Sequence, residues 1–165
     1  MSILRDVVRL TGLGKDFTRL PVILASDDAP ASIVAAVGSV GSVRIKCGER
    51  PDGRILEFYG FTGFAATVTG GTLPNIQTNR LNWTLQVYDE TENTQWFSKP
   101  VWAPIIIPIN AESTTQTAVE KMFMFPKPII VEGAHSWLFE LTNRDGTNAL
   151  NVYQFCLHGY EYVHI

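Results

Sequence analysis

The chain has 165 residues with 45% hydrophobic and 18% charged residues, and its formal net charge is -3. A single domain of this size buries roughly 70% of the surface of its unfolded chain, so it needs no disulfide or metal for stability. The sequence has no basic cluster and no apolar run of the ~20 residues that a membrane span requires, which argues against a nucleic-acid-binding protein and a membrane protein.

The first 42 residues differ in kind from the rest, and we expect residues 1–42 to form an extended N-terminal arm. Glycine and proline recur from Gly12 to Gly41 at intervals that leave little room for long helices or strands. The segment is nevertheless too apolar for an ordinary disordered tail. We therefore predict that it binds a neighbouring subunit through its large apolar side chains, which are Leu10, Leu13, Phe17, Leu20, Val22, Ile23 and Leu24.

From residue 43 onward the apolar residues recur with a period of two, which predicts β-strands. The first such run is Val43 to Cys47. The second, residues 54–64, is interrupted by Gly60 and Gly63, as a β-bulge or a close approach of two backbones would require. The third, residues 81–88, alternates most regularly and predicts a strand with one buried face.

Two further runs contain prolines. Residues 101–109 carry Pro104 and Pro108, and since proline cannot donate to a β-ladder, we expect an edge strand or a corner there. Phe123 and Phe125 alternate with their neighbours, which favours a strand over a helix.

Residues 132–163, close to the end of the chain, predict an antiparallel hairpin formed by residues 136–142 and 151–157. Between them Gly146 follows an aspartate and supplies the positive φ of a tight turn. The runs add up to about seven to nine strands with turn signals about every eight to twelve residues. The sequence therefore predicts an all-β fold in which residues 43–165 form an antiparallel β-sandwich of jelly-roll type.

No motif for nucleophilic catalysis occurs in the chain, and we expect no enzyme. The three histidines are His135, His158 and His164. On one strand the last two would lie about 20 Å apart, too far to share an ion, so we expect no metal and no cofactor. The acidic pairs at residues 27–28 and 89–90 stand beside turn residues, which favours solvated loops over the paired carboxylates of a glycosidase.

The four tryptophans and two cysteines have a structural interpretation. We expect the tryptophans, which are Trp83, Trp96, Trp102 and Trp137, to lie mainly in the core rather than on a sugar-binding platform. Cys47 and Cys156 each lie in an apolar run, which favours buried free thiols over a disulfide and folding in a reducing compartment. The charged residues near Met1 are unlike a signal peptide, so we expect synthesis without export.

Three C-terminal patterns resemble a known class of proteins. They are Pro126–Gly133 (PKPIIVEG), the strand Leu138–Asn143 (LFELTN) and the strand ending Leu157–Tyr162 (LHGYEY). Together they resemble the end of small β-sandwich virion proteins of tailed bacteriophages, of the capsid decoration, cement or head-fibre type. The resemblance covers about 40 residues and carries over no functional residue.

The resemblance implies a non-enzymatic virion structural protein that decorates or cements a bacteriophage capsid through subunit contacts. Its partners would be the major capsid protein or other virion subunits, with homo-oligomers expected. Its location would be the virion, after synthesis in the host cytoplasm. The alternatives are a tail, collar or head-to-tail accessory protein with the same fold, a carbohydrate-binding β-sandwich and, last, a cupin-like enzyme.

Overall fold

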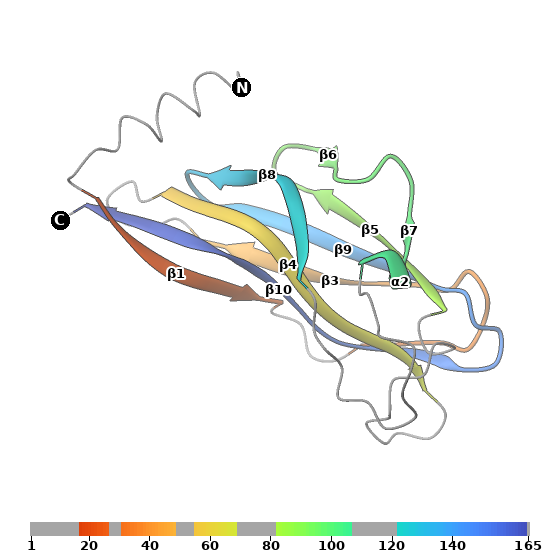
Figure 1. Cartoon of the computed structure of the whole chain (residues 1–165). Coiled ribbons are helices and arrows are strands. Elements are labelled where there is room, and N and C mark those ends of the chain that lie inside the picture. The colour runs from red at the N-terminus through yellow and green to blue at the C-terminus, as the bar shows by residue number, and fades with distance from the viewer. Residues whose placement is uncertain (1–16, 27–30, 49–54, 69–81, 107–121, 165) are drawn as a thin grey trace.

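The structure, a computed structural model, describes residues 17–26, 31–48, 55–68, 82–106 and 122–164 (Figure 1). Leu10 and Leu13 lie outside the described residues, as does the acidic pair at 27–28. The described chain contains ten strands and one short helix. They are β1 (Phe17–Ala25), β2 (Ala31–Ile33), β3 (Val40–Cys47), β4 (Ile55–Val68), β5 (Trp83–Asp89), β6 (Thr94–Gln95), β7 (Val101–Trp102), α2 (Ala103–Ile106), β8 (Phe123–Val131), β9 (His135–Asn143) and β10 (Ala149–His164).

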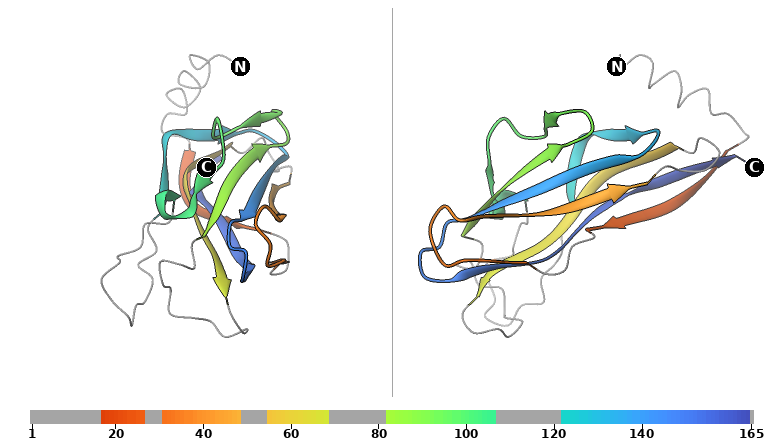
Figure 2. Two further views of the ribbon diagram at one scale, coloured as in Figure 1. Left: turned by 90° about the vertical axis from the view of Figure 1, so that its right-hand side faces the viewer. Right: turned by 180° about the vertical axis from the view of Figure 1, so that it is seen from behind.

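The strands form two antiparallel sheets. Sheet A has the order β1-β10-β4-β8, with β2 also paired to β10. Sheet B has the order β3-β9-β5-β6, with β7 also paired to β5. Sheet A faces the viewer in Figure 1, and sheet B comes to the front when the molecule is turned by 180° (Figure 2). The predicted all-β, antiparallel class is confirmed.

The inner faces of the two sheets share one core, which forms because alternate residues of the long strands β3, β4, β9 and β10 are apolar. Edge-to-face ring contacts cross between the sheets, with centroids 5.7 Å apart for Phe58 and Trp137 and 6.4 Å apart for Trp83 and Phe155. Trp96 is partly buried against the same core. The expected core position is thus confirmed for these three tryptophans, whereas Trp102 is 48% exposed.

The predicted C-terminal hairpin is wrong, because β9 and β10 belong to different sheets. Both strands have the expected alternation, and the aromatic face of β9, with Phe139 at its centre, is fully buried. A hairpin would place the two strands side by side, whereas the intervening loop carries the chain from sheet B to sheet A. Gly146 lies in this loop, but Gly38 is the one glycine with positive φ among the described residues.

Asn143 organises this crossing and is fully buried. Its amide Nδ2 donates to the carbonyl oxygens of Val34 at 3.0 Å and Asn148 at 2.9 Å. Its Oδ1 accepts a hydrogen bond of 2.8 Å from the backbone N–H of Asp145. One side chain therefore joins the β2–β3 loop to the β9–β10 loop at one end of the molecule.

Two predictions about the middle of the chain need correction. Residues 81–88 were expected to have one buried face, but in β5 Thr84 and Gln86 of the opposite face are also buried. Gln86 Nε2 donates to the carbonyl of Phe97 at 2.8 Å, so the chain that follows β6 covers this second face. Within the described part of 101–109, the expected strand covers only β7, and Pro104 lies in the first turn of α2, where its missing N–H is tolerated.

The two glycines of β4 occupy the positions that the sequence predicts for them. The pairing of β4 with β8 shifts register between Phe58 and Gly60, which is a bulge. A Cβ on Gly63 would lie 2.2 Å from the ring of Phe155 on β10, so only glycine fits there without a shift.

Part of the segment predicted as an arm lies in the sheets of its own chain. β1 and β2 both pair with β10, and β3 begins at Val40 rather than at residue 43. A free arm is therefore limited to residues before β1, which lie outside the described residues.

Candidate functional site

The outer face of sheet A carries a cluster of tyrosines and charged residues, which we call the tyrosine face. It consists of Arg19 on β1, Glu57 and Tyr59 on β4, and Tyr160 and Tyr162 on β10. These residues meet because of the register, in which Tyr160 lies opposite Glu57 and Tyr162 lies opposite Arg19. The alternation that buries the apolar residues of β10 turns its tyrosines outward.

The side chains of the tyrosine face stack on one another. The guanidinium carbon of Arg19 lies 3.6 Å from the ring centroid of Tyr160, which is a cation–π contact. The rings of Tyr160 and Tyr59 are 5.4 Å apart and tilted by 35°. Arg19 Nη2 also lies 3.9 Å from Glu57 Oε2. The cluster is therefore largely ordered before any partner binds.

The hydroxyl of Tyr162 donates a hydrogen bond to the Glu57 carboxylate. Burial, together with the hydrogen bond to Glu57 and the negative charge of that carboxylate, raises the pKa of Tyr162 to about 12. The phenol stays protonated at neutral pH, so it serves as a fixed donor and not as a general base.

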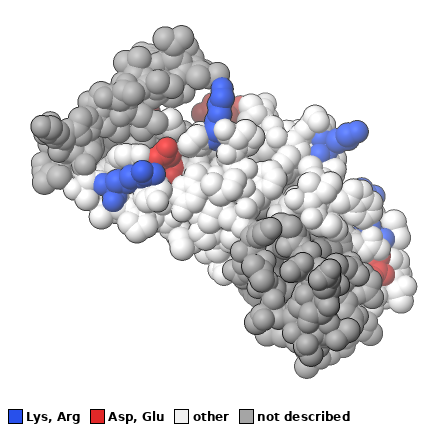
Figure 3. All heavy atoms as spheres, in the orientation of Figure 1, with Lys and Arg blue, Asp and Glu red and all other residues white. Residues whose placement is uncertain are grey.

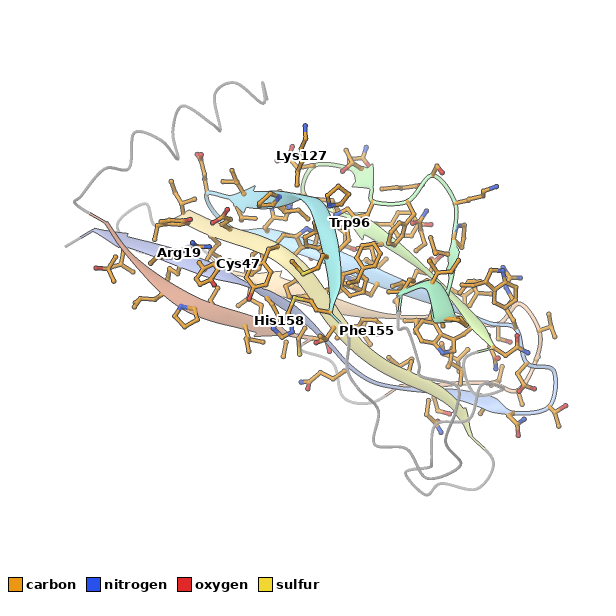
Figure 4. All side chains as sticks on the ribbon, viewed as in Figure 1. Arg19, Cys47, Trp96, Lys127, Phe155 and His158 are labelled. Atoms are coloured by element: carbon orange, nitrogen blue, oxygen red, sulfur yellow. The ribbon has the colours of Figure 1, made fainter. Side chains whose placement is uncertain are left out.

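The outer face continues from the tyrosine face toward the middle of β10. His158 Nε2 and Thr62 Oγ1 form a hydrogen bond of 2.8 Å, and Ile23 of β1 lies opposite His158 and is 63% exposed. Figure 4 shows Arg19 and His158 along the β1 and β10 side of the sheet. Among the described residues, few charged side chains appear on this view of the molecule (Figure 3). The surface is aromatic, polar and sparsely charged, the composition that protein interfaces favour.

The predicted arm residues separate into two groups. Val22 and Leu24 pack against the core of their own chain, whereas Leu20 and Ile23 are 45% and 63% exposed. Phe17 is the first residue of β1 and pairs with His164. Contact with a neighbouring subunit stays a prediction for all seven residues, but Val22 and Leu24 already have an intramolecular role.

Sequence reasoning missed the tyrosine face. The available signal was the spacing of two in Glu57-x-Tyr59 and Tyr160-x-Tyr162, which places each pair on one face of a strand. Their meeting depends on the pairing of β4 with β10, two strands about a hundred residues apart in the chain.

A second polar cluster holds the turn after β5 against β9. Asp89 was expected in a solvated loop, but it is buried and its Oδ2 lies 2.7 Å from Nε2 of His135. Its Oδ1 accepts hydrogen bonds from the backbone N–H groups of Thr91 at 3.1 Å and Glu92 at 2.9 Å. All these contacts are within the fold, so the cluster fixes the turn.

Glu90 completes this cluster on the outer side of sheet B. It accepts hydrogen bonds from Arg44 Nε at 3.1 Å and from Ser136 Oγ at 2.7 Å. The hydrogen bond from Arg44 is the main cause that lowers the pKa of the Glu90 carboxyl. The two acids at 89–90 therefore have separate structural partners.

Cys47 and Cys156 are free thiols, as predicted, although Cys156 is only half-buried. In the described part of the chain, no three His, Cys, Asp or Glu side chains are grouped so that they could hold a metal ion. The same residues include no helix with the length and apolar character needed to cross a membrane.

Comparison of the chain with protein-family models finds no matching family, and comparison with curated proteins finds no relative. The strand order and the tyrosine face are therefore the features of the molecule that bear on its function.

Proposed function

We propose first that the fold is a jelly roll. The antiparallel pairs are nested along the chain: β1 with β10, β3 with β9, β4 with β8 and β5 with β6. Nested pairs alternating between two sheets are what a long hairpin makes when it wraps into two Greek keys, the arrangement of a jelly roll. In this interpretation the loop between β9 and β10 is one of the crossings between sheets.

We infer that the protein is a non-enzymatic structural component of a bacteriophage virion, which decorates or cements the capsid. Viral capsid domains are among the proteins built on jelly rolls, but a fold alone does not define a function. The observation that carries the proposal is the tyrosine face, since tyrosine and arginine are the residues that dominate protein interfaces when they are rigid. Its partner would be the major capsid protein or another virion subunit.

The tyrosine face has the properties that attachment to a shell requires. Arg19, Tyr59 and Tyr160 are stacked in place, so little side-chain entropy is lost when a partner covers them. The exposed Ile23 adds apolar area beside them. A tail, collar or head-to-tail accessory role would use the same surface and differs only in the partner.

The proposal is tested on particles of the phage that encodes the protein. Mass spectrometry of purified virions should detect the chain, and labelled protein should sediment with particles that lack it. Tyr160→Ala should weaken this binding about 30-fold, as expected for loss of an interface hot spot. Gln154→Ala is the matched control, since Gln154 is an exposed residue of the same strand. Absence from virions would contradict the function, and full binding by Tyr160→Ala would place the interface on another surface.

A carbohydrate-binding function is the second candidate, because lectins also use jelly rolls and the exposed face contains tyrosine rings. The exposed Trp102 offers one further ring on the other sheet. Glycan-array binding that Tyr160→Ala abolishes, with no sedimentation on particles, would favour this function over the first.

A further inference from the structure

The edges of the two sheets are not equally protected against pairing with another strand. In sheet A, the edge strand β1 contains Pro21 and the opposite edge strand β8 contains Pro126 and Pro128. The remaining short edge strands, β2, β6 and β7, have three residues or fewer. Prolines and short strands are the means by which proteins block edge pairing.

Pro21 is placed where it blocks the outer side of β1. The backbone N–H of Ser26 donates to Phe155 on β10 at 2.8 Å, so even-numbered residues of β1 direct their backbone toward β10. Because this direction alternates along an antiparallel strand, Pro21 faces the open edge, where it removes a donor without breaking a bond to β10.

β3 is the exception among the described edges. It has eight residues, no proline and an uninterrupted register with β9 from Val40 to Cys47. It stands at the end of sheet B, and no described strand pairs with its other side. Asn143 N–H donates to the carbonyl of Ser39 at 2.8 Å, so odd-numbered residues of β3 face β9. The backbone groups of Val40, Ser42 and Lys46 consequently face the open edge.

We propose that β3 is a dimerisation edge, at which two copies of the chain pair their β3 strands antiparallel and join their B sheets into one. The proposal does not depend on the virion assignment. The two-fold axis passes between the two Val43 residues, so Val40 lies opposite Lys46 of the second copy and Ser42 lies opposite its Arg44. Each opposed pair of outward-facing residues exchanges two backbone hydrogen bonds.

This register follows from charge and from length. An axis at Arg44 would place two arginines opposite each other, and like charges in that position are destabilising. An axis at Ser42 would leave Lys46 beyond the paired residues and shorten the ladder. The axis at Val43 uses the whole strand and opposes each basic residue to an uncharged one. It also covers Val40, which is 57% exposed, with the aliphatic stem of Lys46.

A second copy fits this edge better than an unrelated strand, because the edge is complementary to itself. The side chains of β3 that face solvent are Val40, Ser42, Arg44 and Lys46. When a second copy pairs about Val43, each of them lies opposite a residue of a different kind. Arg44 also forms an ion pair with Glu90 of its own chain, with Nη2 and Oε1 3.0 Å apart. Because no basic residue lies opposite another in this register, the repulsion between the copies is small.

Two substitutions at Ser42 test both the edge and the register in the full-length protein. Ser42 is exposed, so neither change disturbs the core. Ser42→Lys places a second positive charge opposite Arg44 of the other copy, and Ser42→Glu places a negative one there. By symmetry each change acts twice, so sedimentation equilibrium should show the dimer Kd rising roughly two- to thirty-fold for Ser42→Lys and falling by a similar factor for Ser42→Glu.

Matched controls use another edge. Thr18→Lys and Thr18→Glu place the same charges on exposed β1 and should leave the Kd unchanged. Hydrogen exchange adds a direct test, since the amides of Ser42 and Lys46 should become protected as the protein concentration rises. A protein that stays monomeric at all concentrations, or a dimer whose Kd moves in the same direction or not at all for the two Ser42 variants, would overturn the proposal.

Discussion

Replacement of Asn143 by alanine should destabilise the fold far more than its position beside a loop indicates. The substitution removes three hydrogen bonds, with the carbonyls of Val34 and Asn148 and with the N–H of Asp145. At about 1 kcal/mol net for each bond, the free energy of unfolding should fall by about 3 kcal/mol. The loss will be larger if the partners stay buried without water, because an unsatisfied buried group costs about 1 to 3 kcal/mol.

Asn82→Ala is the matched control. Asn82 stands at the same end of the molecule, but within the described residues its Nδ2 makes one hydrogen bond, of 3.1 Å, to the carbonyl of Arg144. Its replacement should cost about 1 kcal/mol. The assay is urea unfolding followed by tryptophan fluorescence, with a slope of about 2 kcal/mol per molar urea. The midpoint should then fall by about 1.5 M for Asn143→Ala and about 0.5 M for Asn82→Ala.

The comparison of the two asparagines can refute the reasoning. Equal shifts below about 0.3 M would mean that backbone hydrogen bonds alone hold the loops. Those bonds join the carbonyl of Asn143 to Gly38 and its N–H to Ser39, and neither substitution removes them. The side chain of Asn143 would then contribute little to the stability of the crossing between the sheets.

Three further predictions concern the core and the tyrosine face. Phe139→Ala removes a buried ring 5.1 Å from that of Phe155 and should lower the free energy of unfolding in urea by about 3 to 5 kcal/mol. The control Glu140→Ala, at a half-exposed residue, should lower it by less than about 1 kcal/mol. Similar small values for both would contradict a central position for β9. Gly63→Ala should cost about 1 to 3 kcal/mol in the same assay, because the added methyl overlaps the Phe155 ring, and a neutral result would show that the ring moves aside freely. The pKa of Tyr162 is raised from 10.0 to about 12, so its contribution to stability is complete below pH 10 and is lost as the pH rises toward 12. Between about pH 10 and 12 the melting temperature should fall less steeply with pH for Tyr162→Phe than for the unmodified protein. Identical curves would argue against the raised pKa.

The strands themselves could be predicted from the sequence because their signal is local. In β3 and β9 the apolar residues recur with a period of two, and the apolar residues of this alternation, such as Ile45 and Phe139, are fully buried. The glycines of β4 were also informative, since each marks a position where another chain segment approaches too closely for a side chain. The alternation of apolar and polar residues along β3 and β9 was therefore sufficient to predict which of their residues are buried.

The pairing of the strands could not be predicted in the same way. The residues between β9 and β10 have the composition of a hairpin turn, and only the position of the core on the far side shows that the chain crosses to the other sheet. For β5, the sequence showed one apolar face, but the second face is covered by a segment that binds Gln86 through a backbone carbonyl. A strand face that is covered by polar backbone groups needs no apolar side chains, so its burial leaves no pattern in the sequence.

The tyrosine face also could not be predicted from the sequence, because it depends on strand pairing. Tyr59 and Tyr160 lie on strands that any sequence analysis would find, yet only the register of β4 with β10 stacks their rings and brings Arg19 onto them from β1. A shift of one residue would turn these side chains into the core and the core residues out to solvent. The apolar core thus fixes the register, and the register in turn assembles the tyrosine face. Substitutions that loosen the packing of β10 should therefore weaken partner binding as well as stability, even where they touch no exposed residue.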